Sequence, residues 1–174
     1  MTQYVYELLE EKGQKFGLKD AGYYALESLR IEKGNRAWGV ELKSTINPLE
    51  AGLGFTIAWK KPDFIGKKAL LEAKKKGITR KIVGFSFDNV DEKVILLGDE
   101  PIYRNNELVG YVTSIKYGHS VKKWVCLGNL KAQEVIDKNW LMRGEFEIEV
   151  LGDRMKVKAH MKGVWDPENK EVFK

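Results

Sequence analysis

Cysteine and long apolar runs are what this sequence lacks most clearly. Cys126 is the one cysteine among 174 residues, so no disulfide can form within the chain and a reducing compartment is expected. No apolar run approaches the roughly 20 residues that cross a bilayer. The first residues also lack the basic and apolar regions of a secretory signal. These absences argue against a disulfide scaffold or a membrane protein, and a cytoplasmic location is expected.

Clustered charge of one sign is also missing. The net charge is +5, but 30 basic residues are interspersed with 25 acidic ones. The densest basic run, Lys74 to Lys76, falls at the end of an expected helix, where cations suit the helix dipole. No nucleic-acid motif is present. His119, Cys126 and His160 lie far apart and lack metal-ligand spacing, so neither nucleic-acid binding nor a metal site is expected.

The first 78 residues combine helices and loops. Residues 4–13 predict a short amphipathic helix, and a stronger one follows Asp20, which we expect to cap it, and ends at Gly34. Ala25, Leu29 and Glu32 fall at helical spacing on one face of the second helix, beside Leu26, and this face is expected to be its apolar side. Three further segments complete this part: a loop over 36–52, a strand over 53–59 and a helix over 65–76.

From Thr79 onward short strands replace the helices. Strands are predicted over 80–88 and 122–130. Hairpins are predicted over 100–114, turning at Asn105 and Asn106, and over 145–161, turning at Gly152 and Asp153. Strands this short and evenly spaced indicate a small antiparallel barrel or sandwich. The fold class is therefore α+β, with residues 1–78 belonging to an α+β domain and 79–174 to the barrel.

Several short segments, in this order and spacing, resemble the glycine-cleavage T-protein (aminomethyltransferase) family. They are Ser28–Glu32 (SLRIE), Pro48–Glu50, Phe64–Gly66 and the closing Asp166–Asn169. The sequence is most similar to the folate-binding halves of dimethylglycine and sarcosine dehydrogenases and to the pyruvate dehydrogenase phosphatase regulatory subunit. The resemblance implies the C-terminal part of a folate-binding domain followed by the family's barrel.

Glu32 is the first candidate for binding tetrahydrofolate. The resemblance places it where the family holds the pterin ring, and a carboxylate can accept two adjacent N–H groups from a 2-amino-4-oxo pyrimidine edge. The alternative is a solvent-exposed ion pair with Arg36, four residues later.

Other candidates for the folate site are cationic or aromatic. Lys61 stands where stand-alone T-proteins have a folate-contacting arginine, and lysine cannot reproduce a bidentate contact. Arg80 is a second cationic candidate, and Trp38, Phe55 and Tyr24 could stack on the pterin or benzoyl ring. The alternatives are charged loops for the cations and core packing for the aromatics.

The resemblance implies one step of a larger reaction. Tetrahydrofolate would accept a one-carbon unit from a small N-methyl amine, and flavin would be needed only if a further N-terminal domain exists, since no G-x-G-x-x-G turn occurs here. No residue of this chain matches the family's catalytic aspartate, so the chain is expected to be inactive alone. The alternative is a non-catalytic regulatory module of the same fold. If the chain comes from a eukaryote, the mitochondrial matrix is the expected location.

Overall fold

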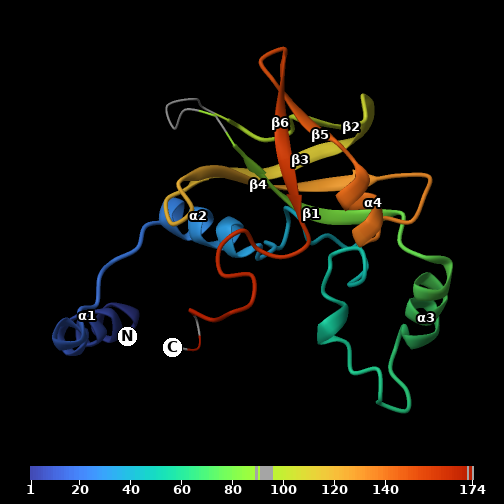
Figure 1. Ribbon diagram of the computed structural model, residues 1–174. Helices are drawn as coiled ribbons and strands as arrows, with labels where there is room; N and C mark the ends of the chain where they lie inside the picture. Colours follow the sequence, from blue (N-terminus) through green and yellow to red (C-terminus); the bar gives the residue numbers. More distant parts are fainter. Residues whose placement is uncertain (89, 91–95, 172, 174) are drawn as a thin grey trace.

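The strands of the second half close into a six-stranded antiparallel barrel in the computed structural model, which describes residues 1–88, 90, 96–171 and 173 (Figure 1). Around the barrel the strands follow the order β1-β4-β3-β2-β5-β6. Their bounds are β1 (Arg80–Phe87), β2 (Pro101–Arg104), β3 (Glu107–Gly118), β4 (Lys123–Lys131), β5 (Phe146–Val150) and β6 (Asp153–His160). The α+β class and the predicted barrel are confirmed.

Alternating apolar residues fill the barrel interior. Phe85, Ile102, Leu130 and Ile148 are all fully buried, as expected for the inward positions of strands with a period of two. Closure leaves the sheet without an open edge, so every strand has two hydrogen-bonded neighbours.

The two hairpin turns differ slightly in their agreement with the sequence. Asn105 and Asn106 both have positive φ, as the turn between β2 and β3 was predicted to require. In the turn between β5 and β6 the positive φ values fall on Leu151 and Gly152, one residue earlier than predicted. Each turn joins strands that pair directly with each other.

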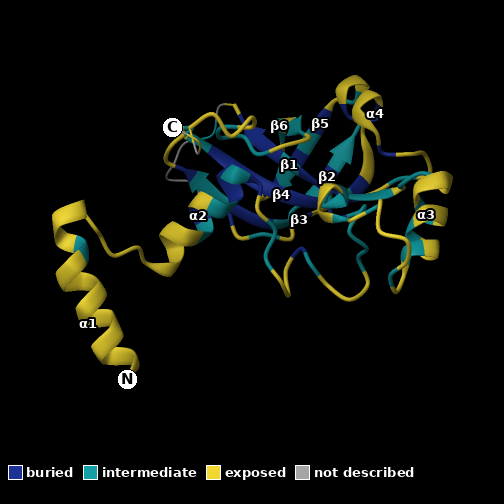
Figure 2. Cartoon of the chain, turned by 90° about the horizontal axis from the view of Figure 1, so that it is seen from below, coloured by how far each residue is buried: buried dark blue, intermediate teal, exposed yellow. Residues whose placement is uncertain are grey.

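The helices lie outside the barrel. They are α1 (Thr2–Gly13), α2 (Tyr23–Lys33), α3 (Lys67–Lys76) and α4 (Lys138–Arg143), with short 3₁₀ helices at Gln14–Phe16 and Gly54–Thr56. α2 packs on β3 and β4, whereas α1 extends away from the barrel and is almost entirely exposed (Figure 2). None of the helices in the described part of the chain is long and apolar enough to cross a membrane.

The predicted strand over 53–59 is wrong. Gly54–Thr56 forms one 3₁₀ turn, and the Trp59 indole donates to the Gly54 carbonyl at 3.2 Å. Gly52 has a positive φ of 72°, a conformation suited to a turn and unsuited to a strand. This segment therefore forms a local turn and does not pair with a neighbouring strand.

The predicted details of the helices also need correction. Asp20 does not cap α2: the N-cap is Gly22, and Asp20 accepts from the Tyr6 hydroxyl. α3 begins at Lys67, two residues later than predicted. The sequence analysis missed α4, whose N-cap Asp137 accepts from the Trp140 backbone at 2.7 Å.

The face that α2 turns to the barrel is not its apolar one. Ser28, Ile31 and Glu32 are buried, whereas Leu26 and Leu29 are each 55% exposed. The expectation that Ala25, Leu29 and Glu32 share one buried face is therefore wrong, because the barrel receives polar as well as apolar side chains. Polar contacts must hold this helix in place.

Gly128 tests how tightly the barrel interior is packed. A Cβ at this position would lie 2.3 Å from Ile102 Cδ1 and 3.1 Å from Phe85 Cε2. We expect Gly128→Ala to lower the free energy of unfolding by about 1–3 kcal/mol because the core is overpacked. Urea denaturation followed by circular dichroism measures this. Gly22→Ser is the control, since nothing lies within 4 Å of its Cβ and serine suits an N-cap position. Equal stability of the two variants would contradict the prediction.

Candidate functional site

Glu32 fastens the end of α2 to the turn between β3 and β4. Its Oε1 accepts from the backbone N–H groups of Ser120 at 2.8 Å and Val121 at 3.1 Å, and its Oε2 accepts from the Ser120 hydroxyl at 3.0 Å. The residue is 1% exposed. Charge-assisted bonds to backbone N–H groups compensate for burying a carboxylate.

Neighbouring contacts also show that α2 lies close to the end of β3. The Ser28 hydroxyl donates to the Tyr117 carbonyl at 2.7 Å, one turn before Glu32. A Cβ at Gly118 would lie 2.8 Å from Glu32 Oε1, so the turn accommodates the carboxylate partly because this residue is glycine. No ion pair between Glu32 and Arg36 occurs in the described structure, so the surface-pair alternative is not seen.

A second buried carboxylate, that of Glu41, joins the loop after α2 to β3. It is 0% exposed and accepts from the hydroxyls of Thr113 at 2.8 Å and Ser114 at 2.6 Å. Arg30 Nη1 lies 3.2 Å from its other oxygen. The sequence analysis missed Glu41, and only an unusually placed acidic residue in an otherwise apolar W-G-V-E-L segment could have indicated it.

Arg30 on α2 connects Glu41 to the helix. It pairs with Glu27 at 2.5 Å, three residues earlier on α2, and donates to the Ser114 hydroxyl at 2.9 Å. The hydrogen bond from Arg30 is the largest influence on Glu27 and lowers the pKa of that carboxyl. The buried side of α2 is thus a polar network, and the helix end holding Glu32 has a fixed position on the barrel.

Beside this network lies a cavity of about 610 Å³, which we term the α2 pocket. Three chain segments form it: the end of α2 with the residues after it, the loop around Gly52 to Phe55, and the stretch after β6. Its cations are Lys33, Arg36 and Lys162. Its lining is Lys33, Gly34, Asn35, Arg36, Gly52, Leu53, Phe55, Met161, Lys162, Gly163, Asp166, Pro167 and Asn169.

Arg36 is the notable group of the α2 pocket. Its Nη1 donates to the Gly34 carbonyl at 2.5 Å, but its Nε is buried without a hydrogen-bond partner in the described structure. Burial lowers the pKa of Arg36, partly offset by the charge of Glu41. Lys33, by contrast, is paired with Asp166 at 3.0 Å and lies over the Trp165 ring. Arg36 therefore brings a positive charge to the lining of the α2 pocket, and a guanidinium suits an anionic ligand.

The structure separates the residues that sequence reasoning grouped together. Phe55 lines the α2 pocket and is 84% exposed, while Glu32 lies at the end of the adjoining helix with both oxygens bonded within the chain. Arg80 is held by Glu50 at 2.8 Å. Lys61 is exposed on a loop.

The remaining two aromatic candidates are exposed as well. Trp38 is 78% and Tyr24 79% exposed, so the core alternative does not hold for either of them. The Lys116 ammonium lies over the Tyr24 ring at 5.2 Å. Neither side chain lines the α2 pocket.

No group of three or more metal-ligating side chains occurs in the described part of the chain. Ser86 Oγ and His160 Nε2 are 2.8 Å apart, and burial lowers the pKa of that histidine. Cys126 is 1% exposed, and burial raises the pKa of its thiol far above the ordinary range.

Two family models match the chain, one before the barrel and one over the barrel. The GCVT N-terminal domain matches residues 1–61, and the glycine cleavage T-protein C-terminal barrel domain matches residues 80–166. The chain belongs to the glycine cleavage T-protein family. The predicted family is thereby confirmed, whereas the division at residue 78 stays a prediction.

Relatives from this family include large multidomain proteins. The chain is 38% identical to the mitochondrial pyruvate dehydrogenase phosphatase regulatory subunit of Mus musculus, over 91% of this chain and 19% of that protein. It is 36% identical to the mitochondrial sarcosine dehydrogenase of Homo sapiens, over 97% of this chain and 18% of that protein. The chain therefore spans about a fifth of the length of either relative.

A solved T-protein has the same fold. The glycine cleavage system aminomethyltransferase T from Bartonella henselae superposes with a TM-score of 0.73 at 26% identity, over 89% of this chain and 42% of that one. The arrangement of α2 on the barrel is therefore that of a T-protein.

The contacts of Glu32 give a stability prediction. Glu32→Ala leaves the N–H groups of Ser120 and Val121 without an acceptor, and we expect a loss of about 1–3 kcal/mol in the free energy of unfolding. Glu32→Gln should cost less, because its amide oxygen can accept from both N–H groups while the Ser120 hydroxyl turns to accept from the NH₂. Urea denaturation compares both with Glu72→Ala on exposed α3. An alanine variant as stable as this control would show that the contacts contribute nothing.

The burial of Cys126 gives a reactivity prediction. Because the thiolate is disfavoured and shielded, we expect native protein at pH 8 to resist iodoacetamide and unfolded protein to react completely. Mass spectrometry after timed exposure, with and without guanidinium chloride, measures the modified fraction. Rapid labelling of the native chain would contradict the burial of this side chain.

Proposed function

We propose that this chain forms the C-terminal wall of a tetrahydrofolate site in a larger protein of the dimethylglycine and sarcosine dehydrogenase type. Bound there, tetrahydrofolate would accept a one-carbon unit derived from an N-methyl amine. The observation that carries the proposal is the α2 pocket, which Arg36, two lysines and an exposed phenylalanine line beside a fixed helix end.

The residues of the α2 pocket fit folate chemically. Arg36 brings a guanidinium to the lining of the pocket, and the folate glutamyl carboxylates are acceptors that suit it. Lys162 adds a second cation, and Phe55 presents an aromatic face on which a pterin or benzoyl ring can stack. Asn35 adds an amide that can both donate and accept.

Glu32 enters this proposal in two possible roles. Its carboxylate positions the helix end, since Ser120 and Val121 already occupy both oxygens. Contact with a pterin would require it to exchange at least the Ser120 hydroxyl for a pterin N–H group. Binding measurements on Glu32 and Ser120 variants distinguish these roles.

The exposed candidates fit a site completed by another part of the same larger protein. Tyr24 and Trp38 lie on the first 40 residues, where Tyr4, Leu9 and Leu26 also expose large apolar surfaces. We infer that upstream folate-domain structure covers this surface, places Tyr24, Trp38 and Lys61 next to the ligand, and supplies the catalytic carboxylate. Arg80, held by Glu50, would act only by shaping the loop.

A non-catalytic regulatory role is the second candidate. The relative with 38% identity is named a phosphatase regulatory subunit, and Lys61 departs from the arginine expected of stand-alone T-proteins. A flavin fingerprint and a folate-domain aspartate in the full reading frame would favour the enzyme, and loss of both would favour the regulator. Both relatives are named mitochondrial, so we propose the matrix as the location if the source is eukaryotic.

Folate binding is tested directly by calorimetry. We expect tetrahydrofolate, kept reduced under nitrogen, to bind the chain, and Arg36→Met to weaken it by about tenfold through loss of a charge-assisted contact. Phe55→Ala should also weaken binding. The matched control is Lys60→Met, an exposed cation outside the α2 pocket.

The same titration decides the role of Glu32. If the carboxylate contacts the pterin, Glu32→Gln weakens binding more than Ser120→Ala does, and if it only positions the helix the two variants behave alike. Absence of binding at millimolar tetrahydrofolate, or binding that Arg36→Met and Phe55→Ala leave unchanged, would overturn the assignment of the α2 pocket.

A further inference from the structure

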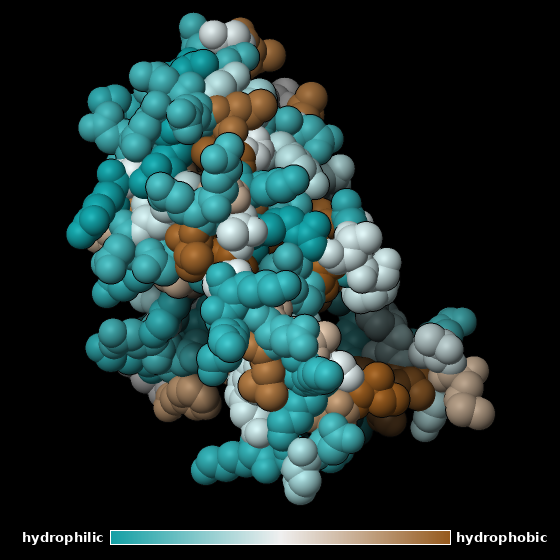
Figure 3. Space-filling model, turned by 90° about the vertical axis from the view of Figure 1, so that its right-hand side faces the viewer, coloured by the Kyte–Doolittle hydropathy of each residue, from teal (hydrophilic) through white to brown (hydrophobic). Residues whose placement is uncertain are grey.

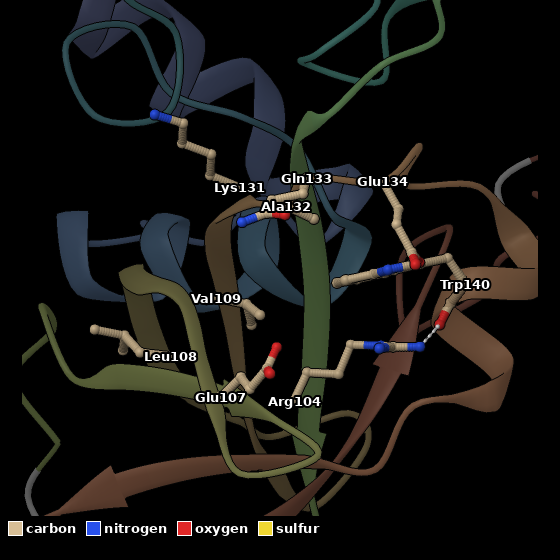
Figure 4. Close-up of a pocket in the computed structure, with 9 residues that line it drawn as sticks. All are labelled: Arg104, Glu107, Leu108, Val109, Lys131, Ala132, Gln133, Glu134 and Trp140. Atoms are coloured by element: carbon tan, nitrogen blue, oxygen red, sulfur yellow. Dashed lines mark hydrogen bonds between the residues drawn. The ribbon is translucent and has the colours of Figure 1, made fainter.

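A second cavity, of about 490 Å³, lies at the mouth of the hairpin formed by β2 and β3 (Figure 4). We term it the hairpin pocket. Its lining is Arg104, Glu107, Leu108, Val109, Lys131, Ala132, Gln133, Glu134 and Trp140. It shares no residue with the α2 pocket. The side of the molecule bearing α3 and α4 is mainly hydrophilic with isolated apolar patches (Figure 3).

Arg104 is held rigidly in the hairpin pocket but has no acidic partner among the described residues. Its guanidinium stacks on Trp140 at 4.1 Å from the ring centroid, and its Nη2 donates to the Trp140 carbonyl at 3.1 Å. Gly144 lies behind it, where a Cβ would come within 2.4 Å of Nε. The other terminal nitrogen, Nη1, has no hydrogen bond within the described structure. A fixed guanidinium of this kind is suited to a carboxylate.

Glu107 lies directly across the hairpin from Arg104 in the strand register. Opposite charges at such positions usually attract each other, and the paired Cα atoms are about 5 Å apart. Here no ion pair joins them in the described structure, because Arg104 is turned onto Trp140. The Glu107 carboxylate points into the cavity instead, and Glu134 extends toward Trp140 from the opposite side (Figure 4).

We propose that the hairpin pocket binds a free zwitterionic α-amino acid with an apolar side chain. Arg104 takes the carboxylate and Glu107, its partner in the strand register, takes the ammonium group. The Lys131 ammonium points away from the other lining side chains (Figure 4), so the acidic side of the pocket is not neutralised by it. Leu108, Val109, Ala132 and Trp140 supply apolar surface for the side chain.

Nuclear magnetic resonance of the Trp140 indole N–H, assigned with Trp140→Phe, tests this with L-leucine as the probe. We expect a saturable shift with leucine. Binding of 4-methylpentanoate, which lacks the ammonium group, and of 3-methylbutylamine, which lacks the carboxylate, should each be about tenfold weaker or more.

Two variants and two controls complete the test. Arg104→Met and Glu107→Gln should each weaken leucine binding by about tenfold, whereas Arg143→Met on α4 and Glu72→Gln on α3 should leave it unchanged. Glu107 is exposed, so its variant keeps the test valid if Arg104→Met does not fold. No shift at 50 mM leucine, equal affinity for 4-methylpentanoate, or unchanged binding by Glu107→Gln would each overturn the proposal. None of these results bears on tetrahydrofolate binding.

Discussion

The hydrogen bonds from Ser120 and Val121 to the buried carboxylate of Glu32 are the contacts on which the rest of this arrangement depends. They fasten the last turn of α2 to the turn between β3 and β4. The residues after the helix, including Arg36, take their places from that point. Because an isolated carboxylate cannot be buried cheaply, the contact is specific to one register of helix on barrel. A purely apolar contact would tolerate sliding of the helix along the barrel, whereas these three hydrogen bonds do not.

Polar docking of α2 has a consequence for its apolar side chains. Ser28, Ile31 and Glu32 form the face of α2 toward the barrel, so Leu26 and Leu29 are left on the outside. Periodicity in the sequence located the helix but could not tell which side faces the barrel, since a stripe of leucines ordinarily marks the buried face. In α2 the leucines lie on the side away from the barrel, which we propose is covered by another part of the larger protein.

The sequence predicted features that depend on local backbone preferences and missed features that depend on particular side-chain contacts. The hairpin at Asn105 and Asn106 depends on residues that tolerate positive φ locally, and it was predictable. The segment from Leu53 to Trp59 has strand-like composition, but its indole bonds back to Gly54, and composition does not encode that contact. Glu32 was recognised as special from its family resemblance, yet its partner lies 88 residues away. Such a partner cannot be read from local spacing.

The barrel itself constrains where ligands can meet this chain. Its interior is filled by side chains such as Phe85 and Ile102, both 0% exposed, so no ligand can enter it. Binding must use the outside or the rims, where loops add charged groups to a rigid scaffold. At one rim Arg36 donates to the Gly34 carbonyl and forms no ion pair with Glu41, which is engaged by Arg30 and two hydroxyls. At the other, Trp140 draws Arg104 away from Glu107. In both places a competing internal contact leaves a guanidinium without its nearest carboxylate, and each becomes available to an anion from outside the chain.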